Sequence, residues 1–202
     1  MSRDAFIYDA IRTPRGKGKP GGGLYEVKPI DLITNLLEAM KARHDLDTTQ
    51  VEDFICATGE PVNEQGQNIA KTALVYSSWD DVTVGAQLHR YCAGGLDAVN
   101  TVAMKIMSGM ESMGVAGGVE SMSRAPFLAP AAREGLRLGH GRLLDSMILD
   151  GLWDPYGDKH MGSCAELCAA KYSFSREAQD AFALESYQRA RRVSEDGSFA
   201  RE

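Results

Sequence analysis

The chain has 202 residues, of which 44% are hydrophobic and 25% charged, values that are ordinary for a globular protein of one or two domains. Its formal net charge of -6 argues against nucleic acid as a main partner. No apolar stretch reaches the ~20 residues that cross a bilayer, and the first residues lack the apolar run of a signal peptide. With four cysteines and enough chain for a core, the sequence predicts a cytoplasmic protein with free thiols and no membrane contact.

The first 120 residues alternate between strand and helix patterns. Strands are expected at 5–11, 51–58, 82–88 and 113–119, and helices from Pro29, at 67–78, and from just after Cys92 to about Ser108. Alternation of this kind predicts an α/β fold in which helices cover both faces of a mostly parallel sheet. Active sites of such sheets lie at the carboxyl ends of the strands.

The composition changes after Ser123, where an irregular segment at 124–130 begins. Helices are expected near 142–148, 162–172 and 176–194, and no strand pattern is convincing here. The expected domains are therefore an α/β domain at 1–123 and part of a mainly helical domain at 124–202.

Cys92 stands where an expected strand ends and an expected helix begins, in the segment RYCAGGLDAV at 90–99. A thiol there ionises more easily, because unpaired backbone N–H groups and the helix dipole stabilise negative charge. The position of Cys92 between a strand and a helix fits a nucleophile and a small buried residue equally well. Gly94 and Gly95 favour the nucleophile, because they let a substrate approach and leave the N–H of Cys92 free to meet an oxyanion.

A nucleophilic cysteine needs a base, and the chain has four histidines. His44 is expected to be solvated, and His140 stands between two glycines, as in a turn. His89 lies three residues before Cys92, roughly 10 Å away on an extended chain and too far for a direct hydrogen bond. His160 is at the start of an expected helix, where a polar group caps the helix or meets a ligand. The sequence therefore shows a nucleophile without an evident base.

Two other patterns favour structural roles. Cys164 and Cys168 share one helix face, but no second ligand pair follows at zinc-site spacing, so apolar packing is preferred over a metal site. In the segment GGVESMS at 117–123, Glu120 and Ser121 are interpreted as parts of a tight strand exit rather than as catalytic groups.

Five segments, taken together, resemble the N-terminal half of a thiolase, that is, an acetyl-CoA acetyltransferase or 3-ketoacyl-CoA thiolase. They are collinear and extend over almost the whole chain: IRTPRG at 11–16, RYCAGGL at 90–96, GGVESMSR at 117–124, HMGSCAE at 160–166 and SREAQDAFA at 175–183. The resemblance implies a thiolase-like α/β fold with a helical loop domain. The segment at 117–123 disfavours a ketoacyl synthase of the same fold.

The resemblance also implies site residues. Cys92 would carry the acyl group as a thioester, and its backbone N–H would form half of an oxyanion hole. Leu152, His160 and Met161 fall where thiolases contact the pantetheine arm of coenzyme A. The family more often has serine at the position of Gly94, a departure that we expect to be tolerated because both residues are small.

The implied activity is acyl transfer of the acetyl-CoA C-acetyltransferase type, by thiolytic cleavage or Claisen condensation of short-chain 3-ketoacyl-CoA. The alternative is a medium- or long-chain 3-ketoacyl-CoA thiolase of β-oxidation, in fatty acid metabolism. Acyl-CoA and CoA are the expected ligands, with no metal and no further cofactor. The resemblance implies a homodimer or homotetramer for the full-length family.

Thiolases are about twice as long as this chain, and their second half supplies a histidine and a second cysteine to the site. Neither motif is present here, which accounts for the missing base. We therefore expect the C-terminal thiolase domain to be absent and the isolated chain to be inactive. The alternatives are a truncated non-catalytic fragment and one half of a split thiolase, whose partner chain carries the other half.

Overall fold

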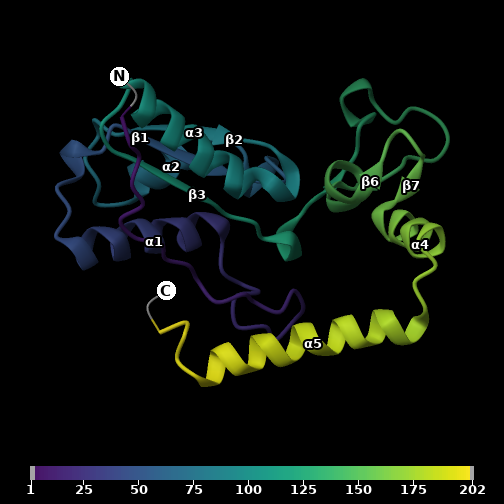
Figure 1. Cartoon of the computed structure of the whole chain (residues 1–202). Coiled ribbons are helices and arrows are strands. Elements are labelled where there is room, and N and C mark those ends of the chain that lie inside the picture. The colour runs from purple at the N-terminus through teal and green to yellow at the C-terminus, as the bar shows by residue number, and fades with distance from the viewer. Residues whose placement is uncertain (1–2, 201–202) are drawn as a thin grey trace. The chain divides into compact units, whose positions relative to one another are not determined.

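The structure is a computed structural model that describes residues 3–200. Its internal contacts divide the chain after Gly151 into two compact units, which are treated separately below (Figure 1). The predicted domain boundary after residue 123 stays a prediction. No helix among the described residues is long and apolar enough to cross a membrane.

The first unit is built on a parallel three-stranded sheet in the order β2-β1-β3. The strands are β1 (Asp53–Ala57), β2 (Val84–Leu88) and β3 (Gly114–Gly118), and the helices are α1 (Pro29–His44), α2 (Ile69–Tyr76) and α3 (Gly94–Ser108). The 3-10 turns are η1 (Thr48–Gln50), η2 (Asn63–Gln65), η3 (Tyr91–Ala93), η4 (Met122–Arg124) and η5 (Ala132–Glu134). This parallel sheet flanked by helices confirms the predicted α/β class.

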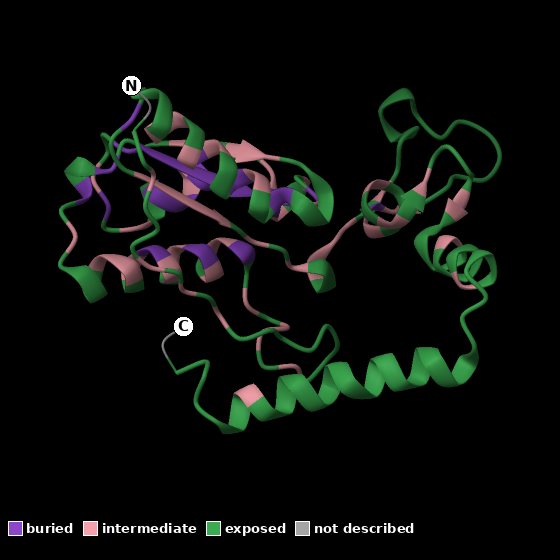
Figure 2. Cartoon of the chain, in the orientation of Figure 1, coloured by how far each residue is buried: buried purple, intermediate pink, exposed green. Residues whose placement is uncertain are grey.

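Helices cover both faces of β1, and the side chains of this strand alternate between them. On one face Phe54 and Cys56 pack with α1 and α2, and on the other Ile55 and Ala57 pack with α3. Figure 2 shows that burial is concentrated in these elements. Every residue of β1 is buried, whereas β2 and β3 are only partly covered.

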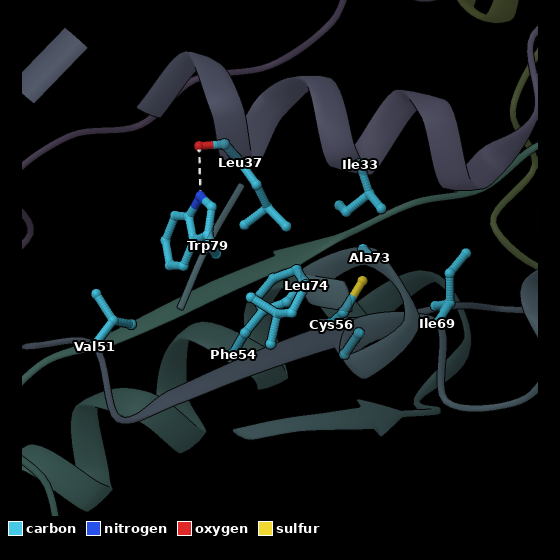
Figure 3. Packing of buried hydrophobic residues seen from close by; sticks show 10 residues of the cluster. Ile33, Leu37, Val51, Phe54, Cys56, Ile69, Ala73, Leu74 and Trp79 are labelled. Atoms are coloured by element: carbon cyan, nitrogen blue, oxygen red, sulfur yellow. Dashed lines mark hydrogen bonds between the residues drawn. The ribbon is translucent and has the colours of Figure 1, made fainter. Parts of the chain in front are cut away.

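Figure 3 shows how the larger cluster is held together. The indole Nε1 of Trp79 donates a hydrogen bond to the backbone oxygen of Leu37 at 3.0 Å, so the one polar atom of this buried ring is satisfied. The aliphatic and aromatic side chains around it come from three elements and the loops between them: Ile33, Leu37, Val51, Phe54, Ile69, Ala73 and Leu74.

The predicted strand at 5–11 is wrong. Residues 5–11 have extended backbone but pair with no strand of the described chain, and Phe6, Ile7 and Tyr8 are exposed. An alternating pattern becomes a strand only when a neighbour accepts and donates its backbone hydrogen bonds. Asp9 anchors the segment to the end of α1: its carboxylate lies 2.7 Å from Nε2 of His44, which is therefore not simply solvated.

The predicted helix at 142–148 is wrong for 142–145, and only its last residues are helical; the expected lack of strands after residue 123 is wrong as well. Residues Leu144–Asp145 form β5, which pairs with β4 (Phe127–Leu128), and a π-helical turn η6 (Met147–Leu152) follows. Closely spaced apolar residues satisfy strand and helix patterns equally well over so short a stretch, so tertiary pairing decides between them.

The second unit contains a short hairpin and two helices. The hairpin pairs β6 (Trp153–Asp154) with β7 (Lys159–His160), and it leads into α4 (Met161–Lys171) and α5 (Arg176–Glu195). Both helices were predicted. The hydroxyl of Ser175 accepts a hydrogen bond from the N–H of Ala178 at 3.2 Å, as an N-cap does.

Gly94 determines how closely the first turn of α3 approaches β1. A Cβ atom at this position would lie 2.8 Å from Cβ of Ala57, whereas a Cβ at the neighbouring Gly95 would meet nothing within 4 Å. Two carbon atoms prefer a separation of ~3.5–4.0 Å. The glycine found where the resemblance leads one to expect serine is therefore part of the packing, and a serine here would require Ala57 to move.

We expect Gly94→Ala to lower the free energy of unfolding by about 1–3 kcal/mol, because it overpacks the contact with Ala57. The matched variant Gly95→Ala should leave it unchanged or raise it by up to ~1 kcal/mol, since alanine is the better helix former. Equilibrium urea unfolding measures both. Adding Ala57→Gly to Gly94→Ala should restore stability, and equal effects of the two single alanines would contradict this account.

Candidate active site

The candidate site lies where the three parallel strands end. After β1 the chain continues through Thr58, Gly59 and Glu60, after β2 through His89 to Cys92, and after β3 through Val119 to Ser121. Parallel strands in register bring these exits to one edge of the sheet.

Cys92 lies in the turn η3, two residues before α3 begins, and it is exposed. Tyr91 just before it has φ +47°, a left-handed conformation that is uncommon for an aromatic residue. The N–H of Ala93 closes the turn by donating to the backbone oxygen of Arg90 at 3.1 Å. This tight turn places the thiol at the N-terminal end of α3, where the sequence pattern expects it. Strained backbone of this kind recurs at functional sites.

The other cysteines are in different surroundings. Cys56 is buried in the core, and burial raises the pKa of its thiol to about 12, so it stays protonated at neutral pH. Cys164 is partly buried on α4, and Cys168 is exposed, which contradicts the expected apolar packing for Cys168. Within residues 3–200, no group of three or more His, Cys, Asp or Glu side chains is arranged to hold a metal ion.

Glu120 joins the exit of β3 to that of β1. Its Oε2 accepts a hydrogen bond from the N–H of Gly59 at 2.5 Å, and its Oε1 accepts one from Nε2 of Gln65 at 2.6 Å. Oε1 of Gln65 in turn accepts from the N–H of Ser121 at 2.6 Å. These contacts give Glu120 and Ser121 the structural role expected of them.

Two glutamines that sequence reasoning passed over complete this network. Gln65 is buried in η2 and also donates to the backbone oxygen of Glu60 at 2.9 Å. Gln87, on β2, donates to Oγ1 of Thr58 at 2.6 Å and accepts from the N–H of Ile69 at 3.2 Å. All three strand exits are thereby cross-linked. In the sequence, Gln87 is recognisable as a polar residue inside an otherwise apolar strand pattern, which indicates a hydrogen-bonding role.

His89 is not placed to act as a base through Nε2. This atom lies 2.8 Å from the backbone oxygen of Gly59, an acceptor, so Nε2 must carry the hydrogen. The ring meets that of Tyr91 edge-on, with 4.6 Å between the centroids. His89 therefore supports the turn that leads to Cys92. His140 lies in an exposed loop of the same unit.

Leu152, His160 and Met161 gather at one end of the β6–β7 hairpin in the second unit. Trp153 pairs with His160, and Leu152 precedes Trp153 while Met161 follows His160, so both are sequence neighbours of this pair. Nδ1 of His160 accepts a hydrogen bond from the N–H of Gly162 at 3.0 Å and caps α4, which leaves Nε2 as its donor atom. The hairpin thus brings together the three residues that the resemblance connects with coenzyme A.

Comparison with known proteins gives consistent matches. An acetyl-CoA acetyltransferase of Pseudomonas aeruginosa is 39% identical over 198 residues, which cover 98% of this chain and 49% of that protein. Acetyl-CoA acetyltransferase 2 of Arabidopsis thaliana is 36% identical over 98% of this chain and 48% of its own length. A β-ketoadipyl-CoA thiolase of Pseudomonas aeruginosa is 36% identical over 100% of this chain and 51% of its own length.

The chain therefore spans about half the length of the curated relatives that it matches. Residues 5–202 match the family described as the thiolase N-terminal domain. The resemblance drawn from the five sequence segments is confirmed: the chain belongs to the thiolase family and corresponds to its N-terminal domain.

Proposed function

We propose that this chain is the nucleophile-bearing half of a thiolase that transfers short acyl groups, of the acetyl-CoA C-acetyltransferase type. The observation that carries the proposal is the exposed Cys92 in a left-handed turn at the N-terminal end of α3. The names of the relatives, mostly acetyl-CoA acetyltransferases, favour acetyl transfer. A longer-chain 3-ketoacyl-CoA thiolase is the alternative.

In the proposed reaction, the Cys92 thiolate attacks the thioester carbonyl of an acyl-CoA. The new bond joins Sγ to the acyl carbon, and the backbone N–H of Cys92 donates to the developing oxyanion. Collapse of this intermediate breaks the bond to the CoA sulfur, which leaves as a thiolate and takes up a proton.

In the condensing direction the acyl group then passes to the α-carbon of a second acetyl-CoA that has lost a proton, and Sγ leaves as the thiolate. In the cleaving direction the thiolate instead attacks the 3-keto carbon of a 3-ketoacyl-CoA, the bond between C2 and C3 breaks, and acetyl-CoA leaves and takes up a proton at C2. Free CoA then accepts the acyl group from Sγ.

Leu152, His160 and Met161 are proposed to contact the pantetheine arm of CoA. Their common position at one end of the β6–β7 hairpin supports this role, because an amphipathic chain needs apolar surface with a few polar groups. Nε2 of His160 supplies a donor there, and Met161 and Leu152 supply apolar surface.

The acid/base groups are proposed to come from the second half of a thiolase. With Nε2 of His89 committed to the carbonyl of Gly59, the chain has no evident replacement in the described part of its first unit. Removing a general base typically slows a reaction by ~10²–10⁴-fold, so the isolated chain should turn over very slowly.

Incubation of this chain with acetyl-CoA should transfer one acetyl group to Cys92. Intact-mass measurement detects the adduct, and peptide mapping locates it. Cys92→Ser should abolish the adduct. The matched variant Cys168→Ser, which removes another exposed thiol, should leave it unchanged. Equal labelling of Cys168 and Cys92, or no adduct on Cys92 even with a complementing second half present, would overturn the proposal.

A second proposal concerns the partner of α3. One side of this helix packs on the sheet through Ala98 and Val102, while Leu96 and Met104 on other sides are 67% and 61% exposed. Met107 on α3 and Met110 just after the helix are exposed as well. A helix with apolar residues on two faces is typical of one covered on both sides. We propose that the second half of a thiolase, on this chain or on a separate one, covers it.

The outward face of α3 should therefore bind a separately produced C-terminal half of the Pseudomonas acetyl-CoA acetyltransferase. Size-exclusion chromatography should show co-elution, and Leu96→Lys with Met104→Lys should abolish it. The matched control is Val75→Lys, at an exposed apolar position on α2, and this variant should still co-elute with the C-terminal half. Association that survives the α3 changes would contradict the proposed surface, and no association at all would favour a non-catalytic fragment. The homodimer or homotetramer expected for the family stays a prediction.

A further inference from the structure

Gly59, two residues after β1, is held at both of its backbone groups. Its N–H donates to Oε2 of Glu120 at 2.5 Å, and its carbonyl oxygen accepts from Nε2 of His89 at 2.8 Å. A Cβ atom at this position would lie 2.6 Å from the same Oε2, so any larger residue would displace the Glu120 carboxylate. Glu120 follows β3 and His89 follows β2, so this one glycine connects all three strand exits.

His89 extends this connection to the turn that carries Cys92. Its ring meets that of Tyr91 edge-on, with 4.6 Å between the centroids. Tyr91 begins η3 with φ +47°, a backbone conformation that persists only where surrounding contacts hold it. Cys92 is the next residue, and α3 begins two residues after it. The contact with Gly59 thus fixes one end of the strained turn, and α3 fixes the other.

The hydrogen bond from His89 to Gly59 does not depend on the charge of the ring. A carbonyl oxygen only accepts, so Nε2 must carry a hydrogen. It does so in the imidazolium as well as in the neutral tautomer that this contact selects. A positioning role of His89 is therefore indifferent to its protonation, whereas the action of a base or of a charged group is not.

We propose that His89 and Glu120 are positioning residues that act on Cys92 through Gly59. Glu120 fixes the backbone of Gly59, His89 is bound to this fixed point, and the contact of its ring with Tyr91 holds the turn. The role rests on the proposed function, because it places the proposed nucleophile at the first N–H groups of α3. Those groups have no partner within the helix and stabilise a thiolate.

Alkylation of Cys92 by iodoacetamide measures this placement without any acyl transfer. The thiolate sulfur forms a bond to the carbon that bears iodine, and iodide leaves, so the rate follows the stabilisation of the thiolate. Cys168, an exposed thiol of the second unit, is alkylated in the same sample and serves as the internal reference. The measured quantity is the ratio of the Cys92 rate to the Cys168 rate, from peptide mapping of the intact chain after labelling.

Two substitutions of His89 separate its donor from its bulk. In His89→Leu the donor is lost, and the ratio should fall about two- to tenfold, as the loss of one hydrogen bond implies. Cys92 is already exposed, so a looser turn gives the reagent no better access. His89→Gln should keep the wild-type ratio, because its amide nitrogen is as many bonds from the backbone as Nε2 and also donates.

The pH dependence distinguishes positioning from other roles of His89. The fall in His89→Leu should be the same throughout the range in which histidine side chains titrate, roughly pH 5 to 8. A fall that changes across this range would overturn the proposal in favour of a base or a charge effect. An unchanged ratio in His89→Leu, or an equal fall in His89→Gln, would overturn it as well.

Gly59→Ala tests the part of Glu120, because the added Cβ displaces its carboxylate. This variant should lower the ratio, whereas Gly23→Ala, whose Cβ would meet nothing within 4 Å, should not. Since both changes act through Gly59, combining Gly59→Ala with His89→Leu should lower the ratio by less than the product of the two single effects. An effect equal to that product would overturn the role of Glu120.

Parallel incubation with acetyl-CoA separates this proposal from the proposed function. If Cys92 takes up no acetyl group but its alkylation follows the expected pattern, the proposed function fails and the positioning role stands. If Cys92 is acetylated, but His89→Leu leaves both acetylation and alkylation unchanged, the positioning role fails and the proposed function stands.

Discussion

The burial of β1 on both faces is the constraint on which the rest of the first unit depends. Phe54 and Cys56 pack against α1 and α2, while Ile55 and Ala57 pack against α3. Because successive side chains of a strand point to opposite faces, a shift of one residue would exchange the two sets. The register of β1 with β2 and β3 is thus determined by packing, and the register determines which residues leave the sheet together.

Polar groups hold both ends of this apolar strand. At its start, Lys105 of α3 contacts Asp53 and lies 2.7 Å from Glu111. Burial alone would lower the pKa of Lys105, but its hydrogen bonds to the two carboxylates outweigh burial and raise it. At the other end, the side chain of Glu120 accepts hydrogen bonds from the N–H of Gly59 and from Gln65, and so connects the exit of β3 to that of β1. A rigid frame of this kind can support a strained turn at Cys92, because the strain costs of order 1–3 kcal/mol.

The sequence predicts most of this frame, because its signals are local. Pro29 at a helix start, the apolar stripe of α1 and the glycines after Cys92 act over one or two helical turns. The segment at 5–11 shows where local signals stop being sufficient: its pattern is that of a strand, but a strand also needs a partner. The network around Gln65 joins residues more than 50 positions apart, so no spacing in the sequence could reveal it.

The two glutamates of one loop show how strongly the surroundings decide chemistry here. Arg124 pairs with Glu64 and lowers its pKa. Burial raises the pKa of Glu60, and the negative charges of Glu120, Asp150 and Asp145 raise it further, although both glutamates follow the same strand within a few residues. The same reasoning applies to the histidines: His89 is near the thiol in the sequence, but its contact with the carbonyl of Gly59 commits Nε2 to donating. A nucleophile can be placed by one turn of one domain. The acid/base groups are proposed to come from the second half of a thiolase, because the described histidine nearest to Cys92 in the sequence has Nε2 committed to a carbonyl.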